Sequence, residues 1–251
     1  MAKNLFIAVV IPCYKVRNKI LDVIERCGPE VSKIYVVDDC CPEGTGYAVK
    51  SACFDPRIEL IFHLKNMGVG GATMTGYSRA IADGAHIIVK VDGDGQMDPV
   101  FLPNLISPIL SGEADYVKGN RFYNLEDIAN MPRIRVLGNS VLSLFSKFST
   151  GYWHLFDPTN GYTAIHASVA KLLPFPKISE RFFFESDMLF RLSLIRAHVV
   201  DMPMVAIYGD EISNLKIRNI SGEFLHNHLK NFLKRIFYNY YLRNMSIDRK
   251  S

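Results

Sequence analysis

Two acidic residues and an amide follow a short apolar segment near the middle of the chain. The segment from Ile87 to Val91 has the length and apolar character of a strand, and directly after it come Asp92, Asp94 and Gln96. In an extended segment, residues two apart project to the same side, so these three side chains can face one ion. Carboxylate and amide oxygens suit Mg²⁺ or Mn²⁺, which typically complete their coordination with water and substrate phosphates. The spacing therefore predicts a metal-diphosphate site, against the alternative of a surface turn that simply ends a strand.

The elements that must position these residues alternate along the first hundred positions. Strands are predicted at residues 5–11, 34–37, 58–63 and 87–91, with helices at 20–27, at 47–53 and up to about 82. Such alternation indicates right-handed βαβ units and a mainly parallel sheet. Beyond residue 99 we expect a helix at 101–110, a short strand at 116–118, apolar periodicity at 132–150, a loop at 157–162, a helix at 182–196 and an extended segment at 199–205. The pattern predicts an α/β fold.

Size, charge and cysteine usage limit the class of protein. The chain has 251 residues, 49% of them hydrophobic, and a net charge of +4, which tolerates anionic substrates but is not a nucleic-acid footprint. No segment reaches the roughly 18 apolar residues of a membrane-spanning helix, and residues 5–11 resemble a first strand more than a signal peptide. Five cysteines without a C-x-x-C pair predict free thiols rather than disulfides or a zinc site. We therefore expect a cytoplasmic protein that does not bind nucleic acid.

Further polar residues stand at the ends of neighbouring predicted strands, which meet at one edge of a parallel sheet. Asp38 and Asp39 can accept hydrogen bonds from a base or a ribose, or can cap a helix; residues 12–14 can form a wall of the same pocket. Residues 68–71 open a helix whose amides favour anions, unless these glycines serve close packing. Thr73 occupies the third-glycine position of the dinucleotide motif, and no P-loop lysine follows, which disfavours hydride transfer and nucleoside triphosphate hydrolysis.

The C-terminal half contributes arginines and further carboxylates. Arg121 follows a short predicted strand and Arg135 lies near the start of the 132–150 segment, and guanidinium groups bind phosphate in bidentate fashion. For Arg133, a solvated helix start is an equal alternative. Asp157 lies in a loop of turn-forming residues. Glu185 follows three phenylalanines, so desolvation can raise its pKa into the range of a general base, unless it is only a helix-start carboxylate.

The motifs, taken together, resemble those of family 2 glycosyltransferases with the GT-A fold. The order of motifs that carries the resemblance is Ile11-Pro12-Cys13-Tyr14, Val37-Asp38-Asp39, Asn66-x-Gly68 and Asp92-x-Asp94-x-Gln96. Three further motifs narrow the resemblance to the dolichyl-phosphate mannose synthase branch, whose bacterial members load undecaprenyl phosphate. These motifs are Gly119-Asn120-Arg121, residues 135–139 and Asp157-x-Thr159-x-Gly161-Tyr162. It spans about residues 4 to 205. The chain departs from the family pattern with Lys15-Val16 after Tyr14 and Cys40-Cys41 after Asp39.

The resemblance implies a set of roles for these residues. The nucleotide-sugar would be bound by Pro12, Tyr14, Asp39, Asn66, Gly68 and Asp92. Mg²⁺ or Mn²⁺ on the diphosphate would be held by Asp92, Asp94 and Gln96, and the acceptor phosphate by Arg121 and Arg135. The catalytic residues would be Asp94, Arg121 and Asp157. The implied reaction is inverting transfer of a sugar from a nucleotide-sugar to a polyprenyl phosphate.

The C-terminal residues are predicted to form an amphipathic helical tail at 216–251, after a GT-A domain at 1–215. One predicted face collects Leu225, Leu229, Phe232, Ile236 and Tyr240, and basic residues lie around it. Such a helix can lie in a membrane interface, giving a peripheral protein on the inner face of the membrane. Packing on the catalytic domain, or pairing with a second chain in a homo-oligomer, is the alternative.

Two other functions are compatible with the motifs. A glycosyltransferase acting on a sugar or protein hydroxyl in surface polysaccharide synthesis would need a base, for which Glu185 and Asp187 are the candidates. A non-enzymatic protein that binds sugar nucleotides is the second, although a complete Asp-x-Asp-x-Gln argues against it. A nucleotidyltransferase would match the fold but lacks its glycine-rich first loop.

Overall fold

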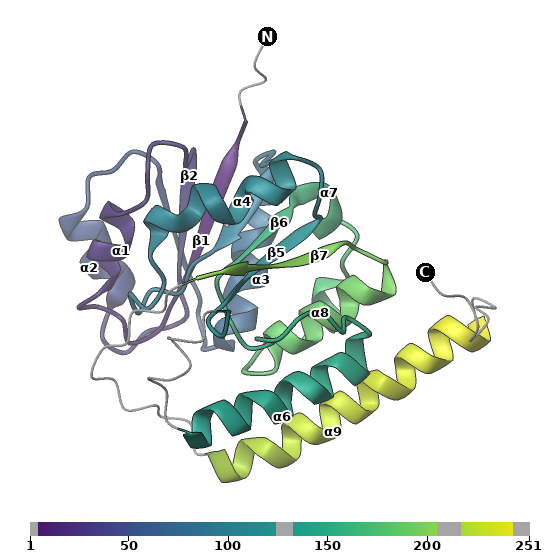
Figure 1. Ribbon diagram of the computed structural model, residues 1–251. Helices are drawn as coiled ribbons and strands as arrows, with labels where there is room; N and C mark the ends of the chain where they lie inside the picture. The colour runs from purple at the N-terminus through teal and green to yellow at the C-terminus, as the bar shows by residue number, and fades with distance from the viewer. Residues whose placement is uncertain (1–4, 124–132, 205–216, 243–251) are drawn as a thin grey trace.

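A seven-stranded sheet forms the centre of the computed structural model, which describes residues 5–123, 133–204 and 217–242 (Figure 1). The strands, in the order β3-β2-β1-β4-β6-β5-β7, are β1 (Ile7–Cys13), β2 (Lys33–Asp38), β3 (Ile58–Phe62), β4 (Ile87–Lys90), β5 (Tyr116–Asn120), β6 (Thr163–His166) and β7 (Val199–Pro203). The pairings of β6 with β4 and β5 are antiparallel, and the other pairings in the described part of the sheet are parallel. The predicted α/β class is confirmed.

Helices cover both faces of the sheet, which explains why the central strands are mostly apolar. One face is covered by α1 (Ile20–Glu25), α2 (Thr45–Ala52) and α4 (Leu102–Leu110), the last preceded by the 3₁₀ turn η1 (Pro99–Phe101). The other is covered by α3 (Gly68–Ala82), α7 (Ala167–Ala170), the 3₁₀ turn η2 (Phe175–Lys177) and α8 (Phe184–Leu194). Along β1, Val9 and Ile11 pack into the first core, whereas Ala8 and Val10 pack into the second. Alternate side chains therefore enter different cores, as expected for a strand buried on both sides.

The first strand extends further than the sequence predicts. We expected Pro12 to end it, but β1 continues to Cys13, with Pro12 opposite Val37 in the parallel ladder with β2. The pairing of β1 with β4 reaches only to Val10, so Pro12 lies beyond that ladder and no bond to β4 is lost through its missing N–H. The extra residues bring Pro12 and Cys13 to the edge where the other parallel strands end.

The strand β6 is absent from the sequence prediction. Its four residues run antiparallel to β4 and β5, and Thr163 pairs with Lys90 on one side and Lys118 on the other. Because β6 is antiparallel, it begins at the edge where its neighbours end. The preceding loop, residues 157–162, is thereby brought to the same edge as the Asp92 segment.

Two long helices, α6 (Arg133–Thr150) and α9 (Ile217–Ile236), lie side by side outside the sheet, with α8 between them and the strands (Figure 1). The π-helical segment η3 (Phe237–Leu242) continues α9. The two helices run parallel, since Phe145 contacts His228 and, further along both helices, Phe148 contacts Phe232. Among the described residues, none of the helices has the length and hydropathy that crossing a bilayer requires.

Most buried positions on α6 and α9 are polar, although Phe145 and Phe148 also contact His228 and Phe232, whereas the outward faces carry apolar side chains. The buried positions of the pair include Ser146, Ser149 and Thr150 on α6 and His228 and Asn231 on α9. The apolar stripe predicted for the tail is mostly exposed instead, with Leu229 54% exposed, and α6 presents its own stripe of Leu137, Val141, Leu144 and Phe148. The tail thus packs on the domain, one of the predicted alternatives, and still leaves its apolar face open.

Candidate active site

The residues predicted to do chemistry gather at the edge where the parallel strands end. Pro12 is the last residue but one of β1, Asp39 follows β2, Asp92 follows β4, and Arg121 follows β5. Asp157 joins them through the loop that precedes β6. Ligands of open α/β sheets bind at this edge, outside the carboxyl ends of the strands.

The segment after β4 presents Asp92, Asp94 and Gln96 as partly exposed side chains. The Asp94 carboxylate accepts a hydrogen bond of 3.0 Å from the backbone N–H of Gln96, and Gly95 between them has φ of +75°. The left-handed conformation at Gly95 favours glycine, and it folds the segment into a tight turn, so the extended geometry expected for residues 92–96 is wrong. The predicted strand end near Val91 is confirmed.

This donor set fits a hard divalent cation and does not fit zinc. Within the described part of the chain, no group of three or more His, Cys, Asp or Glu residues is arranged to hold a metal. Two carboxylates and an amide make an incomplete set, which suits Mg²⁺ or Mn²⁺ because these ions retain waters and substrate phosphates as ligands. A structural zinc site would need a closed set of four nitrogen or sulfur ligands.

A fully buried lysine, Lys90, stands at the base of this segment. Its ammonium donates to Asp92 Oδ1 at 2.6 Å, to the carbonyl of Gly161 at 3.3 Å and to Glu185 Oε1 at 3.3 Å. Burial alone lowers the pKa of Lys90, but the charges of Asp92 and Glu185 outweigh it and raise this pKa above its usual range. The lysine therefore stays charged and holds one oxygen of Asp92.

On the other side of the sheet edge, Asp39 is buried and anchors the start of α3. Its carboxylate accepts hydrogen bonds from the backbone N–H groups of Met67 at 2.8 Å and Gly68 at 2.7 Å, and contacts the His63 ring at 2.8 Å. The Asn66 amide donates to the Asp39 carbonyl at 3.2 Å. The structure therefore brings Asp39, Asn66 and Gly68 together, and nucleotide contacts of these residues stay predictions.

The neighbouring acidic and glycine residues have structural roles in this arrangement. Asp38 accepts hydrogen bonds from the backbone N–H groups of Cys41 and Gly46, so it supports the turn into α2. The amide of Gly71 donates to the carbonyl of Glu180. A side chain at Gly70 would overlap the segment that leads into α8. The close-packing alternative for these glycines is therefore the one the geometry favours. Tyr14 directly follows β1 and its side chain is half exposed, and its predicted nucleotide contact stays a prediction.

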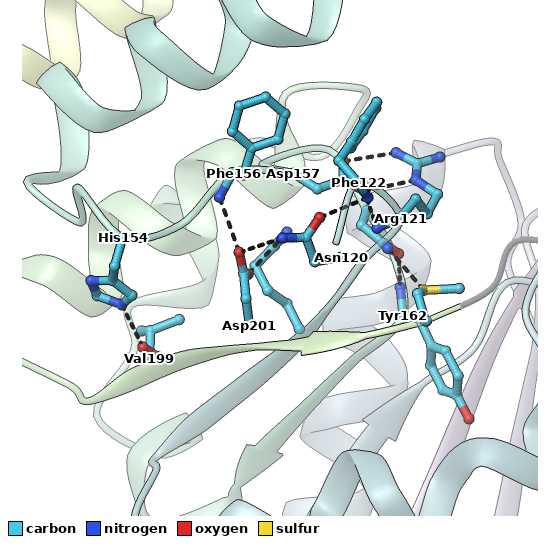
Figure 2. A network of polar contacts seen from close by, with 12 residues as sticks. Asn120, Arg121, Phe122, His154, Phe156, Asp157, Tyr162, Val199 and Asp201 are labelled. Atoms are coloured by element: carbon cyan, nitrogen blue, oxygen red, sulfur yellow. Dashed lines mark hydrogen bonds and ion pairs between the residues drawn. The ribbon is translucent and has the colours of Figure 1, made fainter. Parts of the chain in front are cut away.

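The region predicted to bind the acceptor phosphate is built on the pair of Arg121 and Asp157 (Figure 2). The guanidinium donates to Asp157 through Nε at 2.7 Å and Nη2 at 2.8 Å, and the Arg121 backbone N–H donates to the same carboxylate at 3.2 Å. The Asp157 side chain is 0% exposed. Burial by itself raises the pKa of Asp157, but the bonds and charge of Arg121 outweigh it, so this pKa lies below its usual range.

A second layer of polar contacts holds this pair in place (Figure 2). Asp201 on β7 accepts hydrogen bonds from the Asn120 amide at 3.2 Å and the Phe156 backbone N–H at 3.0 Å. The side-chain oxygen of Asn120 in turn accepts a bond from the Phe122 backbone N–H at 2.9 Å. The residues on either side of Arg121, and Phe156 before Asp157, are therefore tied to the sheet or to each other, which restricts the direction of the guanidinium.

The other predicted arginines cannot be placed in the same way. The backbone of Arg133 and Arg135 belongs to α6, but their side chains lie outside the described residues. The role of Arg135 at an acceptor phosphate therefore stays a prediction.

The two carboxylates considered as bases are both engaged. The pKa of Glu185 is raised by burial, as predicted, although Lys90 acts in the opposite direction. Glu185 lies in the first turn of α8, and its oxygen Oε1 accepts a hydrogen bond from Lys90, the same lysine that contacts Asp92. Asp187 accepts hydrogen bonds from the Ser179 backbone N–H at 2.9 Å and from the Asn231 amide at 3.0 Å, so it ties α9 to α8.

Lys90 and the contact of Gly161 are absent from the sequence prediction. The burial of Lys90 could have been predicted, because a lysine inside the apolar run Ile87 to Val91 is buried whenever that run is a central strand. The partners of Lys90 were not visible, since Gly161 and Glu185 lie 71 and 95 positions away along the chain. A similar lysine, Lys118, interrupts β5 in the same row of the sheet.

In the described part of the chain, the strand order, the antiparallel strand β6 and the carboxylates after β4 agree with the GT-A fold that the motifs predict. The model of the family described as Glycosyl transferase family 2 matches residues 8–173, more than half of the chain. The protein therefore belongs to glycosyl transferase family 2, and it is a glycosyltransferase.

Two characterised relatives match most of the chain. A UDP-N-acetylglucosamine–dolichyl-phosphate N-acetylglucosaminyltransferase of Methanococcus voltae is 29% identical over 218 residues, covering 81% of this chain and 86% of the relative. An undecaprenyl-phosphate mannosyltransferase of Micrococcus luteus is 30% identical over 178 residues, covering 70% of this chain and 72% of the relative. Both names place a lipid phosphate among the substrates of those relatives.

Solved structures support the fold. Glucosyl-3-phosphoglycerate synthase from Mycobacterium tuberculosis, in complex with Mn²⁺, UDP and glucosyl-3-phosphoglycerate, gives a TM-score of 0.64 at 19% identity, covering 92% of this chain and 80% of that one. The complex of the same enzyme with Mn²⁺, UDP and phosphoglyceric acid gives a TM-score of 0.66 at 18% identity, covering 92% and 78%. At such identities the likeness establishes the fold alone.

Proposed function

We propose that this glycosyltransferase moves a sugar from a nucleotide-sugar to a polyprenyl phosphate, with inversion at the sugar carbon and with Mg²⁺ or Mn²⁺. The observation that carries the proposal is the pairing at the acceptor side. Arg121, a cation, is held there by Asp157, while the two candidate bases Glu185 and Asp187 are engaged by Lys90 and by Asn231. The lipid-phosphate substrates named for both relatives point the same way.

The chemistry of the acceptor explains why a cation matters more than a base. A phosphate monoester is largely ionised at neutral pH, since its second pKa is about 6. No proton has to be removed before it attacks, so its approach depends on positioning and charge screening. Arg121 would supply both, because Asp157 and the network around Asn120 fix its guanidinium. In this proposal Arg135 is a second ligand of the acceptor phosphate.

The donor side of the proposal rests on the segment after β4. Asp92, Asp94 and Gln96 would hold the divalent cation, which would neutralise the charge on the leaving nucleoside diphosphate. Pro12, Tyr14 and Asp39 would border the nucleoside, together with Asn66 and Gly68. The identity of the sugar and of the base would depend on the contacts that these residues make.

The surface of α6 and α9 fits an acceptor that resides in a membrane. Their outward stripes are apolar, with Leu144 49% and Leu229 54% exposed, and Lys230 lies exposed beside them. An amphipathic surface with basic residues at its border can lie in a membrane interface. We therefore propose a peripheral location at the inner face of the membrane, with pairing of two copies as the alternative occupant of this surface.

The reaction is tested by product release. The protein is incubated with MnCl₂ and a panel of sugar nucleotides, with or without polyprenyl phosphate, and nucleoside diphosphate is measured. Release that requires the lipid is expected. Arg121→Ala should abolish it, whereas Glu185→Gln should retain most of it. Lipid-independent transfer to a hydroxyl acceptor that is lost in Glu185→Gln would contradict the proposal and favour the hydroxyl alternative.

The membrane surface is tested by vesicle binding. In the double variant Leu144→Ser/Leu229→Ser, cosedimentation with anionic vesicles should fall severalfold, with little change in stability because both side chains are half exposed. Leu172→Ser is the control, since Leu172 is 66% exposed and follows α7, which lies apart from α6 and α9 (Figure 1). Unchanged vesicle binding together with loss of a dimer in the double variant would assign the surface to a second copy.

A further inference from the structure

The ammonium of Lys90 joins three segments that are far apart in the sequence. It comes from β4, and its three acceptors belong to the Asp92 segment, to Gly161 in the loop before β6, and to Glu185 on α8. Lys90 is 0% exposed. A buried ammonium is stable only when its protons meet acceptors, and here each of three acceptors lies within hydrogen-bond distance.

The contacts constrain both oxygens of Asp92. Oδ1 accepts the bond from Lys90 at 2.6 Å. Oδ2 faces the backbone of Gly161 so closely that a methyl group at that position would overlap both Oδ2 and the Lys90 ammonium. Because Gly161 has no side chain, its carbonyl can approach Lys90 and its α-carbon can border Asp92. The carboxylate is therefore held in one orientation before any ligand arrives.

A second buried lysine shows that burial alone does not create this arrangement. Lys118 lies in the same row of the sheet, since Thr163 pairs with Lys90 and with Lys118. It is 1% exposed, but in the described part of the chain its ammonium has no hydrogen-bond partner, and Asp201 Oδ1 is 4.0 Å away. Lys118 thus provides a matched comparison: a buried lysine on β5, which β6 separates from β4 in the sheet.

We propose that Lys90 is a positioning residue of the active site, which orients the Asp92 carboxylate toward the metal-diphosphate and couples it to the loop before β6. This inference rests on the proposed function, because it takes Asp92 to be a metal ligand. Groups that orient a ligating carboxylate typically change metal affinity or activity by about 10- to 100-fold when removed. Lys90 itself touches neither metal nor sugar in this role.

The test is a comparison of Mn²⁺ affinity in three variants. Free Mn²⁺ is measured by electron paramagnetic resonance during titration of the full chain with MnCl₂, in the presence of UDP or GDP. Lys90→Met removes the ammonium and keeps a similar length, so its affinity should fall by about 10- to 100-fold. Lys118→Met should stay within about twofold of wild type. Gly161→Ala should also weaken Mn²⁺ binding, because its methyl group displaces Asp92.

The outcomes separate this inference from the function on which it rests. If wild type binds Mn²⁺ and Lys90→Met or Gly161→Ala binds it equally well, Lys90 does not position Asp92. If wild type binds no Mn²⁺ with either nucleotide, the metal site and this role are both refuted. Should Lys90→Met not fold by circular dichroism, Gly161→Ala decides, because it retains the lysine. An equal loss in Lys118→Met would show a general effect of buried lysines and overturn the inference.

Discussion

Removing the guanidinium of Arg121 should destabilise the protein because it leaves Asp157 as a buried, unpaired carboxylate. The side chains of this pair are 17% and 0% exposed, so the rules for surface ion pairs do not apply. Two of the hydrogen bonds on Asp157, at 2.7 and 2.8 Å, come from the guanidinium, and the backbone bond at 3.2 Å would remain. A bond to a charged group contributes about 1.5–3 kcal/mol, and breaking a buried pair costs about 3–5 kcal/mol.

We therefore expect Arg121→Ala to lower the free energy of unfolding at pH 7 by about 3–5 kcal/mol, measured by urea denaturation with circular dichroism. Arg79→Ala is the matched control. Arg79 pairs with Glu59 at 2.6 Å, yet its side chain is 49% exposed, so solvent screens the pair and its loss should cost much less. Arg121→Ala/Asp157→Asn should be more stable than Arg121→Ala alone, since the unpaired charge is gone.

The pH dependence gives the sign of the effect. Because Arg121 lowers the pKa of Asp157 below its unfolded value, the pair stabilises the fold above about pH 4 and this contribution is lost as pH falls through the folded pKa. The difference between wild type and Arg121→Ala should narrow in that acid range. A cost at pH 7 no larger than that of Arg79→Ala would refute the description of a buried, interdependent pair.

Two further predictions concern the packing around the site. Burial lowers the pKa of His228 to about 4, so the folded state resists a protonation that the unfolded state accepts. The free energy of unfolding should therefore fall by up to about 3 kcal/mol as the pH is lowered from about 6.5 to 4. In His228→Leu, the urea midpoint should not show this fall. In Gly76→Ala, the added methyl group would overlap Val10 where α3 crosses β1, so thermal denaturation should show that the free energy of unfolding falls by about 1–3 kcal/mol. Gly84→Ala is the comparison, because its methyl group meets no neighbouring atom and tests only the positive φ of 87°.

The parallel half of the sheet could be predicted because its signals are local. Each central strand is a continuous apolar run, and the polar residues that follow it mark the edge where ligands bind. Asp92 and Asp39 were located by this rule alone, without any knowledge of their partners. Arg121 was located in the same way after a shorter strand. What these residues touch depends on positions far along the chain, such as the 36 residues that separate Arg121 from Asp157.

The strand β6 escaped prediction for a physical reason. Thr163 to His166 is only four residues long and begins with a threonine, so it lacks the long apolar run of a central parallel strand. Its place in the sheet comes from pairing on both sides, with β4 and β5. Those partners lie outside any local window of sequence. Without β6, the loop that carries Asp157 and Gly161 had no predicted position, and the contact of Gly161 with Lys90 could not be inferred.

The tail shows the limit of amphipathic patterns. Periodicity identified which residues of α9 share a face, but the face that packs on the domain is the one with His228 and Asn231. These buried polar groups are tolerated because Ser149 and Asp187 bond them, which satisfies their hydrogen-bonding capacity in part and fixes the helix on α6 and α8. The leucines are then left outside on two neighbouring helices. Exposed apolar side chains gathered in this way typically mark an interaction site. The proposed lipid acceptor and the proposed membrane-facing surface therefore imply each other. An enzyme whose acceptor stays in a bilayer has to bring Arg121 to the membrane interface, and α6 and α9 are the elements that would hold the enzyme there.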